Sequence, residues 1–123
     1  MLTRQGTRHV HLPRPIKEED MIKVHFNSKD YKLSISGHAN YAEEGKDIVC
    51  AAVSILFYTL AASLEENMLK APVEKEIGKG SSAIQCTPKP EYEGNVGLIY
   101  WQALNGFQLM ADAYPDHVKL IVK

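Results

Sequence analysis

Apolar and polar residues alternate where the chain first shows a regular pattern. Ile22, Val24 and Phe26 alternate with polar neighbours, which is the period of a half-buried strand. Residues 31–36 alternate in the same way, and the polar cluster at 27–30 between the two segments is typical of a turn. The two segments therefore predict a β-hairpin.

A long apolar segment follows, and its spacing is helical. Asp47 precedes it as a candidate N-cap residue, and Pro72 ends it. One side carries apolar residues at helical spacing: Val49, Val53, Phe57, Leu60 and Leu64. The opposite side is also mostly apolar: Ile48, Ala52, Ile55, Leu56 and Ala62. A helix of this kind has to be covered on both sides, so we expect one side to pack on a sheet and the other on a second helix or a partner subunit.

The remaining segments predict three more strands and a second helix. In chain order they are a strand at 73–77, a turn at 78–82, a strand at 83–87, a polar loop at 91–94, a helix at 98–113 and a short strand at 117–122. Gly106 weakens the second helix, and Tyr114 followed by Pro115 ends it. The order ββαββαβ predicts an α+β fold in which both helices pack on one face of a mainly antiparallel sheet.

Residues 1–20 differ from the rest of the chain. They have no apolar periodicity, and Pro13 and Pro15 lie close together, so we expect a disordered leader or extension. Residues 21–123 are expected to form a single domain. The hydrophobic and charged fractions of the chain, 45% and 24%, are ordinary for a globular protein.

Charge and cysteine content limit the classes of function. A net charge of -1 and a pI near 6.5 give no electrostatic basis for binding nucleic acid or an anionic membrane. Two cysteines do not make a disulfide framework, and no segment resembles a secretory signal. The longest apolar segment is interrupted by Ser54, Thr59 and Ser63, so we expect no membrane-spanning helix and a cytoplasmic location with reduced thiols.

One histidine and one cysteine stand out by their places in the predicted elements. Cys50 lies in the first turn of the first helix, where the helix dipole favours a thiolate. His38 lies just beyond the second strand, from where it can reach the cysteine and accept its proton. The alternative is a buried structural cysteine, and the residues alone leave both interpretations open. Cys86 has neither a histidine nor a helix start beside it, so we expect it to be structural.

Several groups near this pair bear on its chemistry. Asp47 is either an N-cap alone or also an acidic group that orients the imidazole. Ser54, one helical turn after Cys50, bonds either the reacting groups or the helix backbone. The backbone N–H groups of residues 49–51 are candidate donors to an oxyanion. No metal site is expected, because no third ligand and no CxxC motif lie near the pair. The loop between His38 and the helix is expected to be mobile and comprises Ala39, Asn40, Tyr41, Ala42, Glu43, Glu44, Gly45 and Lys46.

Two blocks of sequence add a family resemblance to these observations. GHA at residues 37–39 and DIVCAAVS at residues 47–54, with Gly45 between them, resemble the Prp (YsxB-like) family of bacterial ribosomal-processing cysteine proteases. The resemblance extends over residues 21–123 and includes the Tyr114–Pro115 end of the second helix.

The resemblance implies a function and roles for individual residues. Members of the family remove a short N-terminal extension from large-subunit ribosomal protein 27. No cofactor is expected for this chain. By this resemblance His38 is the general base, Cys50 is the nucleophile, and Asp47 and Ser54 support them. The family also implies a homodimer that packs through helices. The competing interpretation is a non-catalytic, ribosome-associated binding module in which Cys50 is structural; a small-molecule thiol hydrolase is a third.

Overall fold

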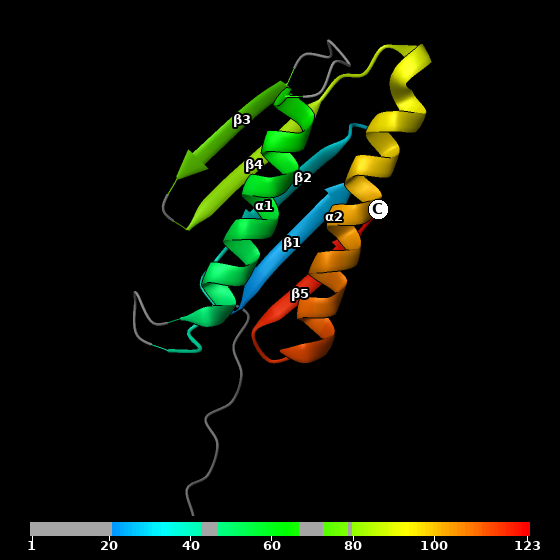
Figure 1. Cartoon of the computed structure of the whole chain (residues 1–123). Coiled ribbons are helices and arrows are strands. Elements are labelled where there is room, and N and C mark those ends of the chain that lie inside the picture. The colour runs from blue at the N-terminus through cyan, green and yellow to red at the C-terminus, as the bar shows by residue number, and fades with distance from the viewer. Residues whose placement is uncertain (1–20, 43–46, 67–72, 79) are drawn as a thin grey trace, which may run out of the picture.

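The computed structural model describes residues 21–42, 47–66, 73–78 and 80–123, which form a layer of helices on a sheet (Figure 1). The elements, in chain order, are β1 (Ile22–Asn27), β2 (Lys32–Ser36), α1 (Ile48–Glu66), β3 (Val73–Gly78), β4 (Ser81–Cys86), the short 3-10 helix η2 (Pro90–Tyr92), α2 (Glu93–Ala113) and β5 (Val118–Val122). This order confirms the predicted α+β fold. The prediction for residues 1–20 lies outside the described residues.

The sheet is mixed but mainly antiparallel, as predicted. Its strand order is β3-β4-β2-β1-β5, and the β1–β5 pair is parallel whereas the other pairs are antiparallel. Val24 of β1 lies opposite Ile35 on one side and Leu120 on the other. Both helices cover the same face of the sheet (Figure 1). The alternation in β1 thus directs Ile22, Val24 and Phe26 into the core between the two layers.

The helices contribute the other half of the core. The predicted stripe of α1 is buried, namely Val49, Val53, Phe57, Leu60 and Leu64. From α2, the ring of Tyr100 packs 5.0 Å from the ring of Phe26, and its hydroxyl donates a 2.6 Å hydrogen bond to the Tyr31 carbonyl. Burial raises the pKa of Tyr100 far above its ordinary range, so this hydroxyl remains a donor. The bond gives a buried polar group its partner.

Most element boundaries lie within one residue of the prediction, but two elements begin at least two residues earlier than predicted. α2 begins at Glu93 and not at residue 98, because η2 leads directly into it from Pro90. Proline suits the first position of a helical turn, and the exposed polar residues that follow it carry no apolar period. β4 begins at Ser81, because its pairing with β2 extends to Ser36. The segments expected to be loop and turn therefore belong partly to regular elements.

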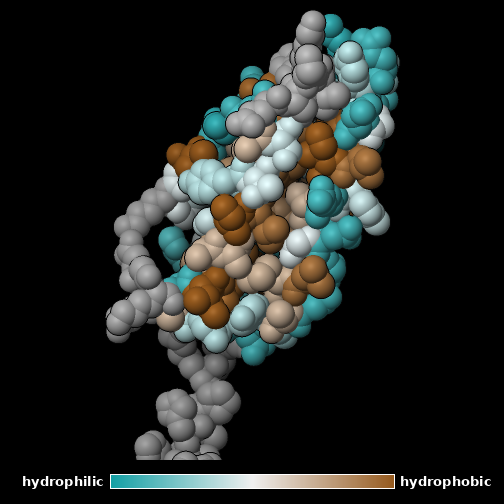
Figure 2. All heavy atoms as spheres, viewed as in Figure 1, coloured by the Kyte–Doolittle hydropathy of each residue, from teal (hydrophilic) through white to brown (hydrophobic). Residues whose placement is uncertain are grey.

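The outer face of the helix layer carries apolar side chains (Figure 2). Ile55 of α1 is 62% exposed, and Leu98 and Trp101 of α2 are 68% and 62% exposed. The segment from Ile48 to Glu65 is long and apolar enough to cross a membrane by length and composition. The expectation that its three hydroxyl residues exclude a membrane-spanning helix is therefore wrong on these two criteria. A core helix meets the same criteria, and α1 buries one side against the sheet.

Candidate functional site

The segment that carries His38 leaves the sheet at Gly37 and is held there by the β3–β4 turn. Gly37 has φ +91°, and a Cβ at this position would clash with the Met21 carbonyl oxygen. Its N–H donates a 2.9 Å hydrogen bond to the Gly80 carbonyl oxygen. Only glycine combines this backbone conformation with so close an approach. His38 therefore enters the site at a fixed point beside Gly80.

The His38 ring lies against the same turn. A Cβ added to Gly80, which has φ +79°, would lie 3.0 Å from His38 Nε2. The side chain is otherwise exposed, and among the described residues no hydrogen bond joins it to the Cys50 thiol. In enzymes without bound substrate, the donor–acceptor distance of a catalytic hydrogen bond is often long. The missing hydrogen bond therefore does not argue against His38 as the base for Cys50.

Cys50 lies in the first turn of α1, as predicted, and its thiol is half-buried. The N–H of Ala39 donates to its Sγ at 3.5 Å. Ala39 is itself fully buried, so its methyl group is part of the core. The residue after His38 is thus in direct contact with the sulfur.

Asp47 caps α1 and anchors the loop before it. Its Oδ1 accepts the N–H groups of Val49 at 3.0 Å and Cys50 at 2.9 Å, and its Oδ2 accepts those of Tyr41 at 3.0 Å and Ala42 at 3.3 Å. Burial opposes ionisation of the carboxyl, but hydrogen bonds from Cys50, Tyr41 and Ala42 outweigh it and lower its pKa. These contacts confirm the N-cap. An acidic group that orients the imidazole would have to bond His38, and no such hydrogen bond is present among the described residues.

The pKa of the Cys50 thiol is raised, contrary to the effect expected from the helix start. Burial is the largest cause, and the negative charge of Asp47 together with its hydrogen bond to the thiol adds to it. The N–H of Ala39 acts in the opposite direction and lowers the pKa. The resting thiol is therefore protonated near neutral pH. A thiol in this state would need a base to remove its proton before it could act as a nucleophile.

The N–H groups expected to bind an oxyanion are already bonded. Val49 and Cys50 donate to Asp47 Oδ1, and Ala51 donates to the Asp47 carbonyl oxygen at 3.1 Å. The resting structure therefore does not support this prediction, because the N-cap takes the same donors.

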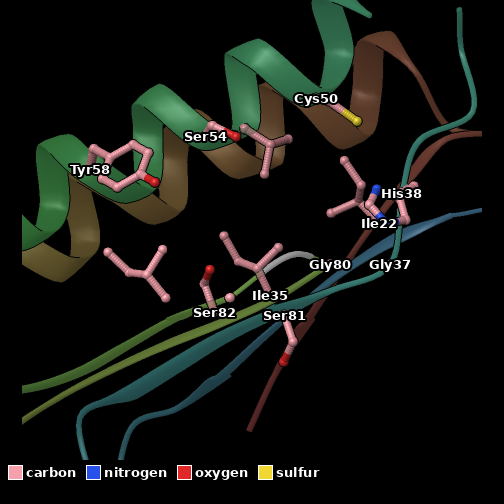
Figure 3. Close-up of a pocket in the computed structure, with 13 residues that line it drawn as sticks. Ile22, Ile35, Gly37, His38, Cys50, Ser54, Tyr58, Gly80, Ser81 and Ser82 are labelled. Carbon is pink, nitrogen blue, oxygen red and sulfur yellow. The ribbon is translucent and has the colours of Figure 1, made fainter. Parts of the chain in front are cut away.

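A surface pocket of about 180 Å³ joins the predicted residues (Figure 3). Cys50 and Ser54 face it from α1, and His38 faces it from the segment after β2 (Figure 3). Its apolar wall is formed by Ile22, Ile35, Val53 and Ile77. Of the predicted loop, residues 43–46 lie outside the described part of the chain, and residues 39–42 are not among the residues that line this pocket.

Three further polar residues that line the pocket were not predicted from the sequence, namely Tyr58, Ser81 and Ser82. Tyr58 lies two turns after Cys50 on the same side of α1, and Ser82 approaches from β4 (Figure 3). Helical spacing was a usable signal for Tyr58. No signal in the sequence could have identified Ser82, because its position depends on the pairing of β4 with β2. Within the residues that the structure describes, no three histidine, cysteine or acidic side chains are grouped to hold a metal ion.

Comparisons with known proteins agree on one family. A family model described as cysteine protease Prp matches residues 21–119. The chain is 31% identical to a ribosomal processing cysteine protease Prp from Mycoplasma genitalium over 98 residues, which cover 80% of this chain and 92% of that protein. The counterpart from Mycoplasma pneumoniae is 28% identical over 89 residues, which cover 72% of this chain and 83% of that protein.

A solved structure agrees at the level of the fold. It is an essential ribosomal processing protease Prp from S. aureus, in complex with a covalently linked product peptide. The TM-score is 0.69 at 23% identity, and the match covers 84% of this chain and all of that one.

Proposed function

The chain belongs to the Prp family and is a cysteine protease; on this premise we propose that Cys50 is its nucleophile and His38 its general base. The observation that carries the assignment is the shared pocket, in which a helix-start cysteine and a histidine from the preceding segment face the same space (Figure 3). Cys86 has no such surroundings, because it is buried at 1% exposure.

The proposed reaction follows from these positions. A peptide enters the pocket, His38 takes the proton from the Cys50 thiol, and the thiolate attacks the scissile carbonyl carbon. The acyl-enzyme forms as His38 returns the proton to the leaving amine, and His38 then activates the water that releases the acid. Ser54 and Tyr58 supply hydroxyl groups to the pocket wall near the reacting groups. Asp47 supports the reaction by fixing the start of α1.

We propose that the substrate is the N-terminal extension of large-subunit ribosomal protein 27. Support comes from the relatives, which are ribosomal processing proteases, and from the solved S. aureus relative, which holds a peptide. A surface pocket with an apolar wall fits a peptide side chain better than it fits a charged small molecule. We also infer a cytoplasmic location, because both cysteines are free thiols.

The test of this function is cleavage of a peptide that spans the extension junction of ribosomal protein 27 from the same organism. Mass spectrometry follows the products for the wild-type chain, Cys50→Ala and the matched control Cys86→Ala. A single cut that only Cys50→Ala loses supports the proposal. Cleavage retained by pure Cys50→Ala overturns the nucleophile.

Absence of cleavage is interpreted through the reactivity of Cys50 toward iodoacetamide. No cut together with an inert Cys50 favours the non-catalytic binding module. No cut together with a Cys50 that reacts faster than Cys86 overturns the substrate assignment and leaves the nucleophile standing.

We further propose that two copies of the chain form a homodimer through the outer face of the helix layer. The exposed apolar side chains of both helices support this, because isolated helix layers rarely leave such side chains in water. Ile55→Glu and Trp101→Glu are expected to shift the mass measured by light scattering to that of a monomer. Val122→Glu, at an exposed apolar residue of β5, is the control and should leave the mass unchanged. A wild-type monomer would contradict the proposal.

A further inference from the structure

His117 lies in the turn between α2 and β5, far from the site in sequence. Its backbone is fixed on both sides: its N–H donates to the Tyr114 carbonyl oxygen at 2.9 Å, and its own carbonyl oxygen accepts the Ile22 N–H at 2.8 Å. The turn thereby joins the end of α2 to the start of β1. The position from which the His117 side chain projects is therefore set by the core of the domain.

The side chain of His117 contacts the backbone beside the proposed nucleophile. Its Nδ1 lies 2.7 Å from the Ala39 carbonyl oxygen. Because a carbonyl oxygen only accepts, Nδ1 carries the proton in this bond. Ala39 is the fully buried residue whose N–H faces Cys50 Sγ at 3.5 Å. Ala39 thus accepts a hydrogen bond from His117 with its carbonyl oxygen and donates one to the Cys50 sulfur with its N–H.

Aromatic contacts hold the next part of the same segment. The ring of Tyr41 meets the ring of His117 edge-on at 5.3 Å, and meets that of Tyr114 in the same manner at 5.4 Å. Asn40, between Ala39 and Tyr41, has φ +49°, a left-handed conformation that asparagine tolerates. The segment after His38 is therefore bent in a defined way around His117.

We propose that His117 is a positioning residue for Cys50, holding Ala39 so that its N–H faces the sulfur. The inference rests on the proposed function, in which Cys50 is the nucleophile. Without the His117 bond, the buried Ala39 carbonyl group would lack a partner, and the segment would move to regain one. The N–H would then leave the sulfur, and the negative charge of the thiolate would lose a donor.

The charges around the thiol determine how this loss is measured. Asp47 faces the thiol from the start of α1 and raises its pKa, whereas the N–H of Ala39 lowers it. His38 and Tyr58 are the other titratable side chains that line the same pocket. The variants keep all of these groups, so loss of the Ala39 N–H is expected to raise the pH at which Cys50 becomes reactive.

The test compares two substitutions of His117. In His117→Asn the side-chain amide nitrogen takes the place of Nδ1 and still donates, whereas His117→Leu fills space without a donor. Iodoacetamide labelling of Cys50 is followed between pH 7 and 10.5 by peptide mass spectrometry, with Cys86 as internal reference. His117→Leu is expected to move the labelling midpoint upward by about half a pH unit or more, and His117→Asn by much less. In peptide cleavage, His117→Leu should lower kcat about 5-fold with little change in KM.

The outcomes separate this inference from the proposed function. A midpoint that is the same in His117→Leu and wild type, or that moves equally in both variants, overturns the positioning role. Labelling needs no peptide substrate, so the expected shift without any cleavage would instead count against the protease substrate. If His117→Leu does not fold, His117→Met replaces it, because its flexible side chain also fills space without a donor.

Discussion

The two cysteines of this domain lie in different environments. Cys86, at the end of β4, is almost completely buried, and burial alone raises the pKa of its thiol. Cys50 is half-buried, and its pKa is raised by burial and by Asp47 and lowered by the Ala39 N–H. Cys50 also opens onto a pocket that contains a histidine, whereas the described residues of that pocket do not include Cys86.

The difference teaches that a raised thiol pKa does not by itself mark a structural cysteine. At Cys86 burial is the cause of the raised pKa within the described part of the chain, so the shift is a simple cost of desolvation. At Cys50 the opposing effects come from groups that a neighbouring base or a bound substrate can change. A thiol that is protonated at rest and close to a base suits a nucleophile that is activated only during the reaction.

The largest expected effect comes from removing each thiol in turn. Cys50→Ala is expected to lower cleavage at least about 1000-fold, because the proposed nucleophile is lost. Cys86→Ala should keep kcat within about 2-fold but reduce the free energy of unfolding by about 1–2 kcal/mol, because it leaves a small cavity. Peptide cleavage and urea unfolding measure the two quantities. The comparison fails if Cys86→Ala loses cleavage while it remains folded.

The next effect concerns the turn against which His38 lies. Gly80→Ala places a Cβ 3.0 Å from His38 Nε2 in a left-handed backbone, so kcat/KM is expected to fall about 10-fold and stability by about 1–2 kcal/mol. Gly97→Ala on α2 is the matched control, since no heavy atom lies within 4 Å of the added Cβ. It should keep kcat/KM and gain up to about 1 kcal/mol of stability. Equal kinetic effects at both glycines would refute the role of Gly80.

A smaller effect concerns the charge beside Cys50. Asp47→Asn removes a charge that raises the pKa of the Cys50 thiol, so its labelling midpoint should move to lower pH. The midpoint of Cys86 should not move, because burial alone sets its shift. Labelling of both cysteines in one sample gives the comparison directly. An upward shift at Cys50 would mean that the lost cap, and not the charge, dominates.

The smallest effect is on stability in acid. The pKa of Asp47 is lowered in the folded chain, so its contribution is present above the unfolded value near 4 and is lost as the pH falls through the folded value. Asp47→Asn should therefore be less stable than wild type at pH 6, and this difference should narrow by pH 2.5. Thermal unfolding at the two pH values measures it. A difference that widens in acid would contradict the lowered pKa.

Local sequence signals predicted those parts of the site that lie within one element. An aspartate directly before a helix can accept hydrogen bonds from the N–H groups of the first turn. The N-cap role of Asp47 was therefore predictable, and it is confirmed by the bonds from Val49 and Cys50. The same rule argues against an oxyanion site at residues 49–51, because an N-cap occupies those donors. Helical spacing placed Cys50 and Ser54 on one side of α1. The α2 start was missed because its first turn is polar and exposed.

Contacts between elements distant in sequence were not predictable from spacing. Gly80 meets His38 only because β4 pairs with β2 in one particular register, which ends at Ser36 and Ser81. His117 reaches Ala39 only because β5 lies parallel beside β1. One residue of difference in either register would move these contacts to the other face of the sheet. Alternation predicts the strands, but it does not predict their partners.

The parallel pairing of β5 with β1 also sets an order for assembly during synthesis. Cys50 and His38 leave the ribosome early, whereas β5 is the last of the described strands to emerge. Ala39 gains its bond to His117 only after β5 has docked beside β1. A nascent chain that already contains Cys50 and His38 therefore lacks the contact that we propose positions Ala39 beside the sulfur. Full protease activity is therefore expected only after β5 has been made and has docked beside β1.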